Sequence, residues 1–438
     1  MRNFRFIDLL LWCLITAPFP VFAVNPGEQH SLYEVNNMAQ PDSMSVVAIV
    51  GVTLIDGLGG DALPDAAVIV QGNRIIAVGP RSSLEIPAGA EKVNGRDLTL
   101  LPGLIDAHFH LNGNRELPLL FLRHGITSIR DPGAWIESYD PVRQAGTELP
   151  RLFLSGPHLD NPPPAYPKNS MIVRDAHECR DAVNRFIDQG ASVIKAYFRL
   201  PLGLIQVAAQ TAHARGVPVT AHLEIVDAGD GIRAGLDGIE HITSCGTALV
   251  PLRQAEQFRQ AILADNNARR EGRYELWSDV DLTAPRVQAL IDLMVGHGIY
   301  LVPNLAVFER RSGDKGITDM HLQGFSNMMA FTRMAHRAGV RIVVGSHSSV
   351  PHAERGWAYQ REMEMLVETG MTPREAITAA TIQNARFFRT ESRTGSIEVG
   401  KLADLVLVEG NPLNDIRSMR RIQRVMLNGI WISTDNTE

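Results

Sequence analysis

Hydrophobic positions follow two different periods along this chain. In the stretches 45–101 and 389–438, short segments alternate apolar and polar side chains between Gly and Pro turns, as at 46–50, 67–70 and 403–408. A period of two is typical of half-buried strands in an antiparallel sheet. Because the same pattern occurs near both ends, we expect the two stretches to pair into one small β-sandwich domain.

Between these stretches, apolar runs of strand length alternate with amphipathic segments of helical period. Strands that alternate with helices are typical of parallel β-α-β units. Eight such runs occur in order, at 103–110, 126–130, 151–155, 192–196, 217–222, 238–241, 300–303 and 342–347. The repeats predict an α/β protein, with a (β/α)8 TIM barrel over 102–388 beside the β-sandwich domain.

The first residues have the features of an export signal. Two arginines precede an apolar run over 9–15, and Val21 and Ala23 are small side chains where a signal peptidase requires them. We predict a signal peptide over 1–23, a polar leader over 24–44, and a periplasmic or secreted protein. A short membrane anchor is the alternative, but the run is far below the ~20 residues that span a bilayer. No stable membrane insertion is therefore expected after cleavage.

Composition narrows the class of protein. With 438 residues, 45% of them hydrophobic, the chain can build a large core, which excludes a disordered or fibrous protein. A net charge of −6 gives no electrostatic reason to bind nucleic acid or an anionic membrane. We expect a small-molecule partner, uncharged or cationic, and a homo-oligomer is compatible with the sequence. Three cysteines without CxxC spacing exclude a disulfide framework and a thiolate zinc cluster, and Cys245 is expected to be a buried, unreactive thiol.

Histidines and one lysine stand at the ends of the predicted strands. His108 and His110 are two residues apart and therefore project from the same face of the first strand. Lys195 ends the fourth strand, His222 the fifth and His241 the sixth. The carboxyl ends of barrel strands meet on one rim, where imidazole nitrogens can bind divalent metal ions, zinc above all. Ordinary polar side chains at strand ends are the alternative, because a His-x-His pair alone is weak evidence.

Lys195 has a specific use in such a site. A lysine inside a barrel loses its charge readily, and the neutral amine can add carbon dioxide to form a carbamate, an anion that bridges two cations. The sequence thus favours two divalent ions joined by a carboxylated Lys195. A salt-bridged lysine, or one that extends from the strand end to water, is the alternative.

Together these motifs resemble the amidohydrolase superfamily, in its imidazolonepropionase-like and Xaa-Pro dipeptidase-like branch. The resemblance covers nearly everything after residue 45 and rests on 102–110, 125–131, 194–195, 221–222, 239–241 and 395–408. It implies a metal-dependent hydrolase in which a metal-bound hydroxide attacks a carbonyl. The ligands it implies are His108 and His110 for one ion, His222 and His241 for the second, and carboxylated Lys195 between them.

The sequence departs from this pattern at the end of the eighth strand. Where the branch has Gly-Thr-Asp, this chain has Gly345, Ser346 and His347, so no carboxylate stands there. A neutral imidazole can accept a proton from metal-bound water and return it to a leaving nitrogen, so we predict His347 as the catalytic proton shuttle. A role as metal ligand and a lost activity are the alternatives. Glu224 and Glu240 are substitute carboxylates, although ordinary hydrogen bonds or salt bridges suit them better.

Substrate contacts are expected from the loops that follow the strands. Tyr197 and Trp277 are the candidate substrate-binding residues, although packing is an alternative for such aromatic side chains. The connection 243–282, which contains Trp277, could close over the site as a lid. Arg269 and Arg270 form a doublet that we expect on a solvated face.

These features predict an exported, metal-dependent amidohydrolase. Its substrate would be a small molecule with an amide-type carbon–nitrogen bond, such as a dipeptide, a cyclic amide or an N-acyl compound, rather than an ordinary protein. Hydrolysis of an ester, lactone or phosphotriester is one alternative, because the same nucleophile attacks these electrophiles. A non-catalytic, metal-stabilised binding protein is the other.

Overall fold

The computed structural model describes residues 36, 38–145 and 148–433. The predicted signal peptide over 1–23 and most of the leader lie outside the described residues. The end of the leader is described, and Asn36 lies against the barrel there. Its amide donates to the carbonyl of Pro150 at 2.9 Å and its oxygen accepts from the amide of Leu152 at 2.8 Å. No helix in the described part of the chain is long and apolar enough to cross a membrane.

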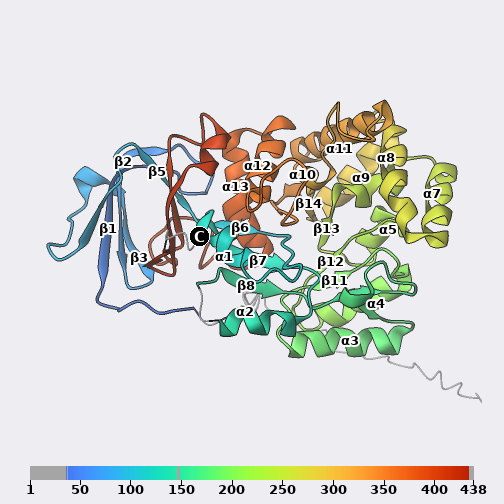
Figure 1. Cartoon of the computed structure of the whole chain (residues 1–438), viewed down its shortest axis with the longest axis horizontal. Helices are drawn as coiled ribbons and strands as arrows, with labels where there is room; N and C mark the ends of the chain where they lie inside the picture. The colour runs from blue at the N-terminus through green and yellow to red at the C-terminus, as the bar shows by residue number, and fades with distance from the viewer. Residues whose placement is uncertain (1–35, 37, 146–147, 434–438) are drawn as a thin grey trace, which may run out of the picture. The chain divides into compact units, whose positions relative to one another are not determined.

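One sheet joins the two ends of the chain (Figure 1). Its strands are β1 (Val46–Leu54), β2 (Leu63–Gln71), β3 (Arg74–Pro80), β4 (Glu91–Asn94), β5 (Leu98–Pro102), β16 (Leu405–Glu409), β17 (Ile422–Leu427) and β18 (Ile430–Trp431). They are arranged in the order β18-β17-β16-β5-β1-β2-β3, with β4 paired to β1. The antiparallel pairing of β16 with β5 connects the C-terminal strands to the N-terminal ones. This confirms the predicted β-sandwich domain that both ends of the chain build.

The alternating pattern explains why this sheet forms. Ile49, Val68 and Leu407 are fully or almost fully buried in its own hydrophobic cluster, separate from that of the barrel. Between β2 and β3, Gly72 has a φ of +54°, a left-handed conformation that costs glycine nothing and closes the hairpin tightly. Local sequence thus fixes both the buried face and the turn of this unit.

The middle of the chain forms the strands of the barrel. All eight predicted runs overlap a strand, although most of the strands are shorter than their runs, and two additional strands lie between the third and fourth runs. The strands are β6 (Leu104–Asp106), β7 (Ile126–Asp131), β8 (Arg151–Leu154), β9 (His158–Asp160), β10 (Ser170–Ile172), β11 (Ile194–Ala196), β12 (Val219–Ala221), β13 (Gly238–Glu240), β14 (Tyr300–Val302) and β15 (Arg341–Ile342).

These strands pair in parallel in two groups, β6-β7-β8 and β10-β9-β11-β12-β13-β14-β15. Backbone hydrogen bonds bridge the two gaps between the groups. The amide of Ser192 donates to the carbonyl of Leu154 at 2.7 Å, and the amide of Ala107 donates to that of Val344 at 2.9 Å. This parallel arrangement of strands agrees with the predicted (β/α)8 barrel.

Helices follow the strands and cover the barrel (Figure 1). They are α1 (Leu117–Arg123), α2 (Asp140–Gln144), α3 (Ala176–Asp188), α4 (Leu202–His213), α5 (Ala228–Arg233), α6 (Gly246–Leu249), α7 (Leu252–Ala264), α8 (Arg269–Ser278), α9 (Pro285–Gly296), α10 (Leu305–Phe308), α11 (Asp319–Arg337), α12 (Ala358–Glu368), α13 (Pro373–Thr378) and α14 (Asn384–Phe387). The local sequence explains why α3 forms. The Asp175 carboxylate caps its first turn, and Cys179, Val183 and Phe186 form its buried stripe.

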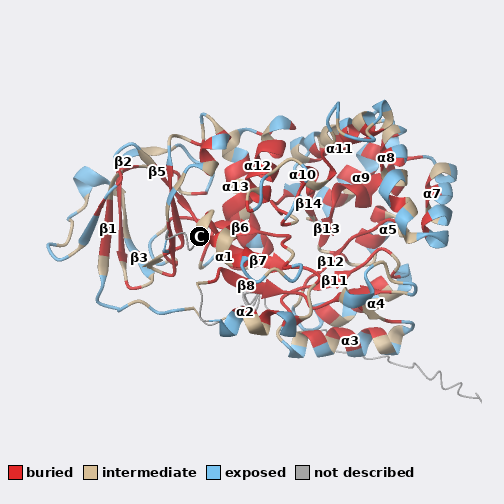
Figure 2. Cartoon of the chain, viewed as in Figure 1, coloured by how far each residue is buried: buried red, intermediate tan, exposed pale blue. Residues whose placement is uncertain are grey.

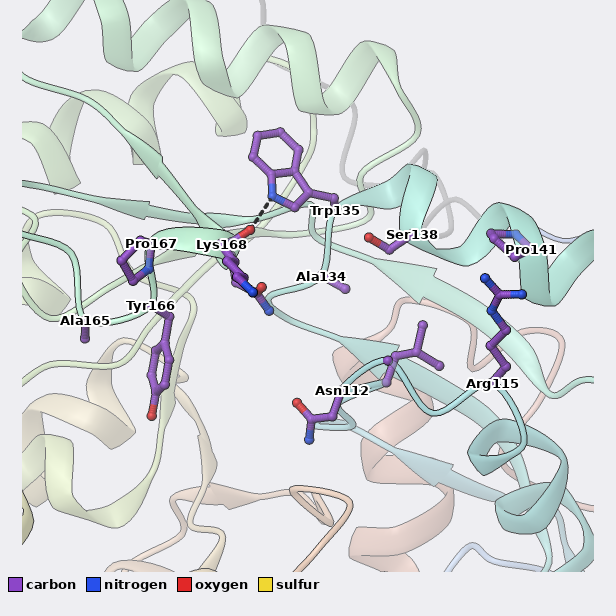
Figure 3. Close-up of a pocket in the computed structure, with 13 residues that line it drawn as sticks. Asn112, Arg115, Ala134, Trp135, Ser138, Pro141, Ala165, Tyr166, Pro167 and Lys168 are labelled. Carbon is purple, nitrogen blue, oxygen red and sulfur yellow. Dashed lines mark hydrogen bonds between the residues drawn. The ribbon is translucent and has the colours of Figure 1, made fainter.

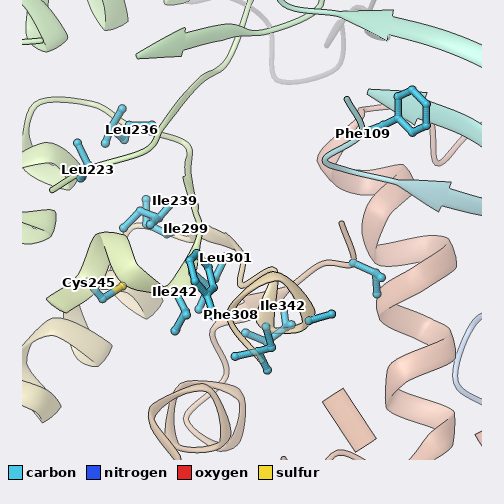
Figure 4. Close-up of a cluster of buried hydrophobic side chains, with 14 of the residues drawn as sticks. Phe109, Leu223, Leu236, Ile239, Ile242, Cys245, Ile299, Leu301, Phe308 and Ile342 are labelled. Carbon is cyan, nitrogen blue, oxygen red and sulfur yellow. The ribbon is translucent and has the colours of Figure 1, made fainter. Parts of the chain in front are cut away.

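The core of the barrel lies between its strands and helices (Figure 2). Figure 4 shows Leu223, Ile239, Leu301 and Cys245 among these apolar side chains. Burial raises the pKa of the Cys245 thiol to about 12, so the thiolate is not formed near neutral pH. The expectation of a buried thiol is confirmed, and its raised pKa agrees with an unreactive one.

A buried ion pair fastens the sheet domain to the barrel. Arg151, at the start of β8, contacts both carboxylate oxygens of Asp404, at 2.8 and 3.1 Å. The same carboxylate accepts a hydrogen bond from the backbone amide of Asn428 at 2.7 Å. Asp404 belongs to the 395–408 motif noted in the sequence, so this motif helps to hold the sheet domain against the barrel.

Candidate active site

The His-x-His motif lies directly beyond β6. The carboxylate of Asp106 accepts a hydrogen bond from the amide of His108 at 2.9 Å, which turns the chain at the strand end. The two side chains then lie together, with 3.0 Å between the Nε2 atoms of His108 and His110. The spacing of two residues predicted that both side chains project from the same side of the strand. The structure agrees, since one nitrogen of each imidazole lies close to the other.

His347 joins this pair from the end of the eighth strand run. Its ring centroid lies 5.3 Å from that of His108 and 4.8 Å from that of His110. One ring nitrogen from each of the three residues can be chosen so that all lie within 4.8 Å of one another. His347 and Ser348 have φ values of +58° and +64°, a conformation that is uncommon for residues other than glycine and is often retained where function requires it.

His222 and His241 complete the cluster from β12 and β13. Their ring centroids are 4.5 Å apart, and that of His241 lies 4.6 Å from that of His108. Burial lowers the pKa of His222 to about 4 and that of His241 well below its ordinary value, so both rings are neutral at pH 7. Neutral imidazoles present lone pairs, which is the form that a metal ion binds.

Lys195 and Glu240 form a buried pair beneath the histidines. The Lys195 ammonium lies 2.5 Å from the Glu240 carboxylate, and both side chains are at most 1% exposed. Burial lowers the pKa of Lys195 to about 8, although Glu240 opposes this shift. Arg130 contacts the same carboxylate at 2.8 Å, which together with Lys195 keeps the pKa of Glu240 well below its usual range despite burial.

Glu240 also orients the first histidine of the motif. Its Oε2 lies 2.7 Å from Nδ1 of His108, a distance at which the carboxylate favours the tautomer with the proton on Nδ1. The Nε2 atom of His108 is then the lone-pair nitrogen and faces His110. A carboxylate behind a histidine in this way fixes the tautomer and orientation that a metal ligand needs.

The donor set fits divalent metal ions. Within the described residues, the Nδ1 atoms of His222 and His241 are buried and have no hydrogen-bond partner. Leaving such atoms unpaired costs free energy unless another group binds there. Nitrogen donors without a thiolate suit zinc. All five predicted ligands, His108, His110, Lys195, His222 and His241, line one cavity together with His347.

Glu224 contacts both a histidine of the cluster and an arginine of α8. Its carboxylate lies 3.3 Å from Nε2 of His222 and 3.0 Å from Arg273, on α8. Arg273 and His222 keep the pKa of Glu224 at about 2 despite its burial. Glu224 therefore links the connection between β13 and β14 to His222.

The cavity around the cluster has a volume of about 390 Å³. Tyr197 lines it as expected, with its ring stacked on His158 at 4.2 Å between centroids. The prediction for Trp277 is wrong: this residue is fully buried and packs on Phe331, with 5.8 Å between ring centroids. Trp277 lies on the face of α8 that packs against α11, so it cannot reach the cavity.

Several further side chains line the same cavity. Arg269 is 6% exposed, so the expectation of a solvated face is wrong for it. Its spacing of four from Arg273 was the available signal, because residues four apart share one face of a helix. The further lining residues, which carry no motif of their own, are Asn112, His158, Tyr166, Asn169, Val307 and Phe308.

A second, outer cavity of about 840 Å³ adjoins this site (Figure 3). It shares Asn112, Tyr166 and Asn169 with the inner cavity. One wall is fixed by Trp135, whose indole nitrogen donates to the carbonyl of Lys168 at 2.8 Å. The two cavities together can take a ligand that extends well beyond the histidine cluster.

Comparison with known proteins agrees with this architecture. The model of the amidohydrolase family matches residues 99–432. An ochratoxinase from Aspergillus niger is 24% identical over 87% of this chain and 84% of its own, and an imidazolonepropionase from Pseudomonas aeruginosa is 27% identical over 78% and 87%. The crystal structure of a putative prolidase from Bifidobacterium longum superposes with a TM-score of 0.69 at 26% identity, covering 89% of this chain and 95% of that one.

Proposed function

Because this chain belongs to the amidohydrolase family and is a hydrolase of carbon–nitrogen bonds, we propose that it cleaves an amide-type bond in a small molecule. The substrate would be a dipeptide, a cyclic amide or an N-acyl compound. An ochratoxinase and an imidazolonepropionase are similar to this chain in sequence, and a putative prolidase is similar to it in structure, which supports this proposal. The two adjoining cavities, of about 390 and 840 Å³, have room for such a substrate.

The observation that carries this proposal is the convergence of histidines from four separate strand ends on one cavity. His108, His110, His222 and His241 would hold two divalent ions, zinc in our proposal, with Lys195 between them. Such ions polarise a carbonyl and lower the pKa of a water molecule, which supplies both electrophilic and nucleophilic help. The protein contributes the neutral imidazoles, the orienting carboxylate of Glu240 and the enclosed cavity.

We propose that Lys195 is carboxylated in the working enzyme. The reaction requires the neutral amine, which adds carbon dioxide and releases a proton, and a pKa of about 8 leaves part of the lysine neutral near pH 7. Arg130 would then remain the cationic partner of Glu240, so this carboxylate keeps one charge-assisted contact. The carbamate adds the negative charge that a set of neutral histidines lacks.

His347 is our candidate for the proton transfer. It borders the cavity and lies beside His108 and His110, and burial with neighbouring histidines keeps its pKa well below the ordinary value. A neutral imidazole in this position can take up a proton and deliver it to the leaving nitrogen. The carboxylates of Glu240 and Glu224 are engaged by basic side chains, which leaves His347 as the better acceptor.

A second candidate function rests on the same residue. If the histidine at this place marks a lost proton-transfer step, the protein would bind metal and small molecules without turnover. A screen of dipeptides, N-acyl amino acids, cyclic amides, lactones and phosphotriesters decides between the two, with metal-stripped protein as the control. Metal-dependent hydrolysis of an amide supports the proposed enzyme. Stoichiometric metal without turnover of any compound supports the binding protein.

We propose in addition that the protein is exported, either to the periplasm or out of the cell. The support is the signal-peptide pattern over 1–23. Expression of the full chain, followed by cell fractionation and sequencing of the mature N-terminus, tests this. A mature protein that begins at Val24 is expected, and an uncleaved chain in the cytosolic fraction contradicts the proposal.

A further inference from the structure

Three arginines on α8 line the cavity that holds the histidines. Arg269, Arg270 and Arg273, named here the arginine wall, lie on the first turns of this helix. Glu224 is the carboxylate paired with the wall, at 3.0 Å from Arg273 and 3.9 Å from Arg269. One carboxylate against three guanidinium groups leaves this side of the cavity with an excess of positive charge.

The other side chains that line the cavity bring no negative charge to balance the arginine wall. No aspartate or glutamate is found among the described residues that line it. Apart from the histidines and the arginine wall, the lining consists of Lys195 and of amide, aromatic and aliphatic side chains. A neutral or cationic substrate would leave the positive wall unbalanced in a partly desolvated space, which costs free energy.

Two members of the wall are held in place by aromatic rings. The Arg269 guanidinium lies 5.0 Å from the ring centroid of Phe198 and donates to the Tyr166 hydroxyl at 3.0 Å. The Arg273 guanidinium lies 5.3 Å from the ring centroid of Phe308. Contact with a ring restrains a guanidinium without occupying the N–H groups at its edge.

Arg270 is different, because it is exposed and makes none of the hydrogen bonds or ion pairs found among the described residues. It nevertheless borders the cavity beside the two restrained arginines. Its planar group can donate two parallel hydrogen bonds to one carboxylate. Arg270 thus has both the free donors and the position to meet an anion that enters the site.

We propose that the arginine wall binds a free carboxylate of the substrate, with Arg270 as the direct donor. The favoured substrates are then N-acyl amino acids or dipeptides with an unblocked C-terminal carboxylate, and neutral amides are disfavoured. This inference rests on the proposed function and narrows it. It also replaces the expectation of an uncharged or cationic partner, because the net charge of −6 describes the whole chain and not this cavity.

A titration that needs no turnover tests the carboxylate site. Calorimetry compares 3-phenylpropionate with 3-phenylpropanol, which matches it in shape and lacks the charge, on the protein as purified. The wild type is expected to prefer the acid, and Arg270→Gln to lose affinity for the acid by about tenfold, the usual size for one charge-assisted hydrogen bond. Affinity for the alcohol should not change, and Arg270→Lys should restore part of the loss.

Arg253→Gln is the matched control, since Arg253 is exposed on the neighbouring helix α7 and does not line the cavity. It should bind both compounds like the wild type. Equal binding of acid and alcohol by the wild type overturns the proposal. So does an Arg270→Gln variant with undiminished affinity for the acid, because the carboxylate then contacts another group, such as a metal ion.

Measurements of turnover provide a second test of the carboxylate site. The kcat/KM of the wild type should be higher for N-acetyl-L-phenylalanine than for N-acetyl-L-phenylalaninamide, with release of acetate as the signal, and Arg270→Gln should shrink this ratio. A preference for the amide contradicts the carboxylate site. If neither compound is hydrolysed, deacylation of N-acyl amino acids fails as a function, while the calorimetric arm still decides the carboxylate site.

Discussion

The backbone amide of His347 donates a hydrogen bond to the backbone carbonyl of His108, with 2.7 Å between nitrogen and oxygen. Two further bonds join the same segments, since the amide of His110 donates to the Ser348 hydroxyl at 2.6 Å and that of Ser346 to the Asp106 carboxylate at 2.9 Å. The segment that departs from the family pattern is therefore fastened to the His-x-His motif through its main chain and its serines. The place of residue 347 does not depend on its own side chain.

This fixed position allows a clear test of His347. His347→Ala should lower turnover by roughly 10²–10⁴-fold, the range for loss of a general acid–base group, with metal content largely kept. His347→Asp restores the family's carboxylate at the same place, and aspartate tolerates the left-handed backbone better than alanine does. It should keep or restore hydrolysis.

The pair of variants separates the alternatives for His347. Loss of metal in His347→Ala, measured by elemental analysis, assigns it as a ligand. An inactive wild type with an active His347→Asp variant shows that the natural protein has lost its shuttle. Undiminished turnover in His347→Ala removes this residue from the mechanism and directs attention to Glu224 and Glu240.

The metal content of the protein provides a second prediction. Purified from zinc-supplemented medium, each chain should hold about two divalent ions, because the clustered imidazole nitrogens offer lone pairs that a cation can bind. His108→Ala should lose both metal and activity, whereas His297→Ala, at an exposed site outside the cavity, should retain them. Elemental analysis that finds no stoichiometric metal in the wild type contradicts the metal centre.

Carboxylation of Lys195 is open to chemical rescue. Lys195→Ala should be inactive, and added short carboxylic acids should recover part of the activity by occupying the space left by the carbamate. Reconstitution of metal-free wild type should likewise give less activity without bicarbonate. Lys315→Ala, an exposed lysine, serves as the control for the substitution itself. A Lys195→Ala variant with full metal content and full turnover rules out the bridge.

Glu240 should be important for stability. Glu240→Gln leaves Arg130 and Lys195 buried without their anion, so the free energy of unfolding is expected to fall by roughly 3–5 kcal/mol. Asp65→Asn is the comparison, because Asp65 pairs with Arg81 at the surface and such pairs contribute about 0–1 kcal/mol. Urea denaturation of the metal-free proteins measures both changes. Equal effects of the two substitutions would show that the buried network contributes no more than a surface pair.

The sequence by itself determined the architecture and the identity of the side chains that cluster in the cavity. Alternation of period two defined the strands at both ends of the chain, and the eight apolar runs defined the barrel, because burial of a strand or helix face leaves a local periodic trace. His108, His110, Lys195, His222 and His241 followed from their positions at strand ends. The closure of a barrel then requires those ends to meet on one rim.

The tertiary structure decided which side chains meet across long separations. Lys195 pairs with Glu240, and Arg269 lies buried at the cavity although its doublet suggested a solvated face. Trp277, on the same helix, turns instead to the core. The direction of a side chain on a covering helix depends on how that helix packs, and helix packing is set by contacts with residues far away in the chain, which leave no periodic signal in the local sequence.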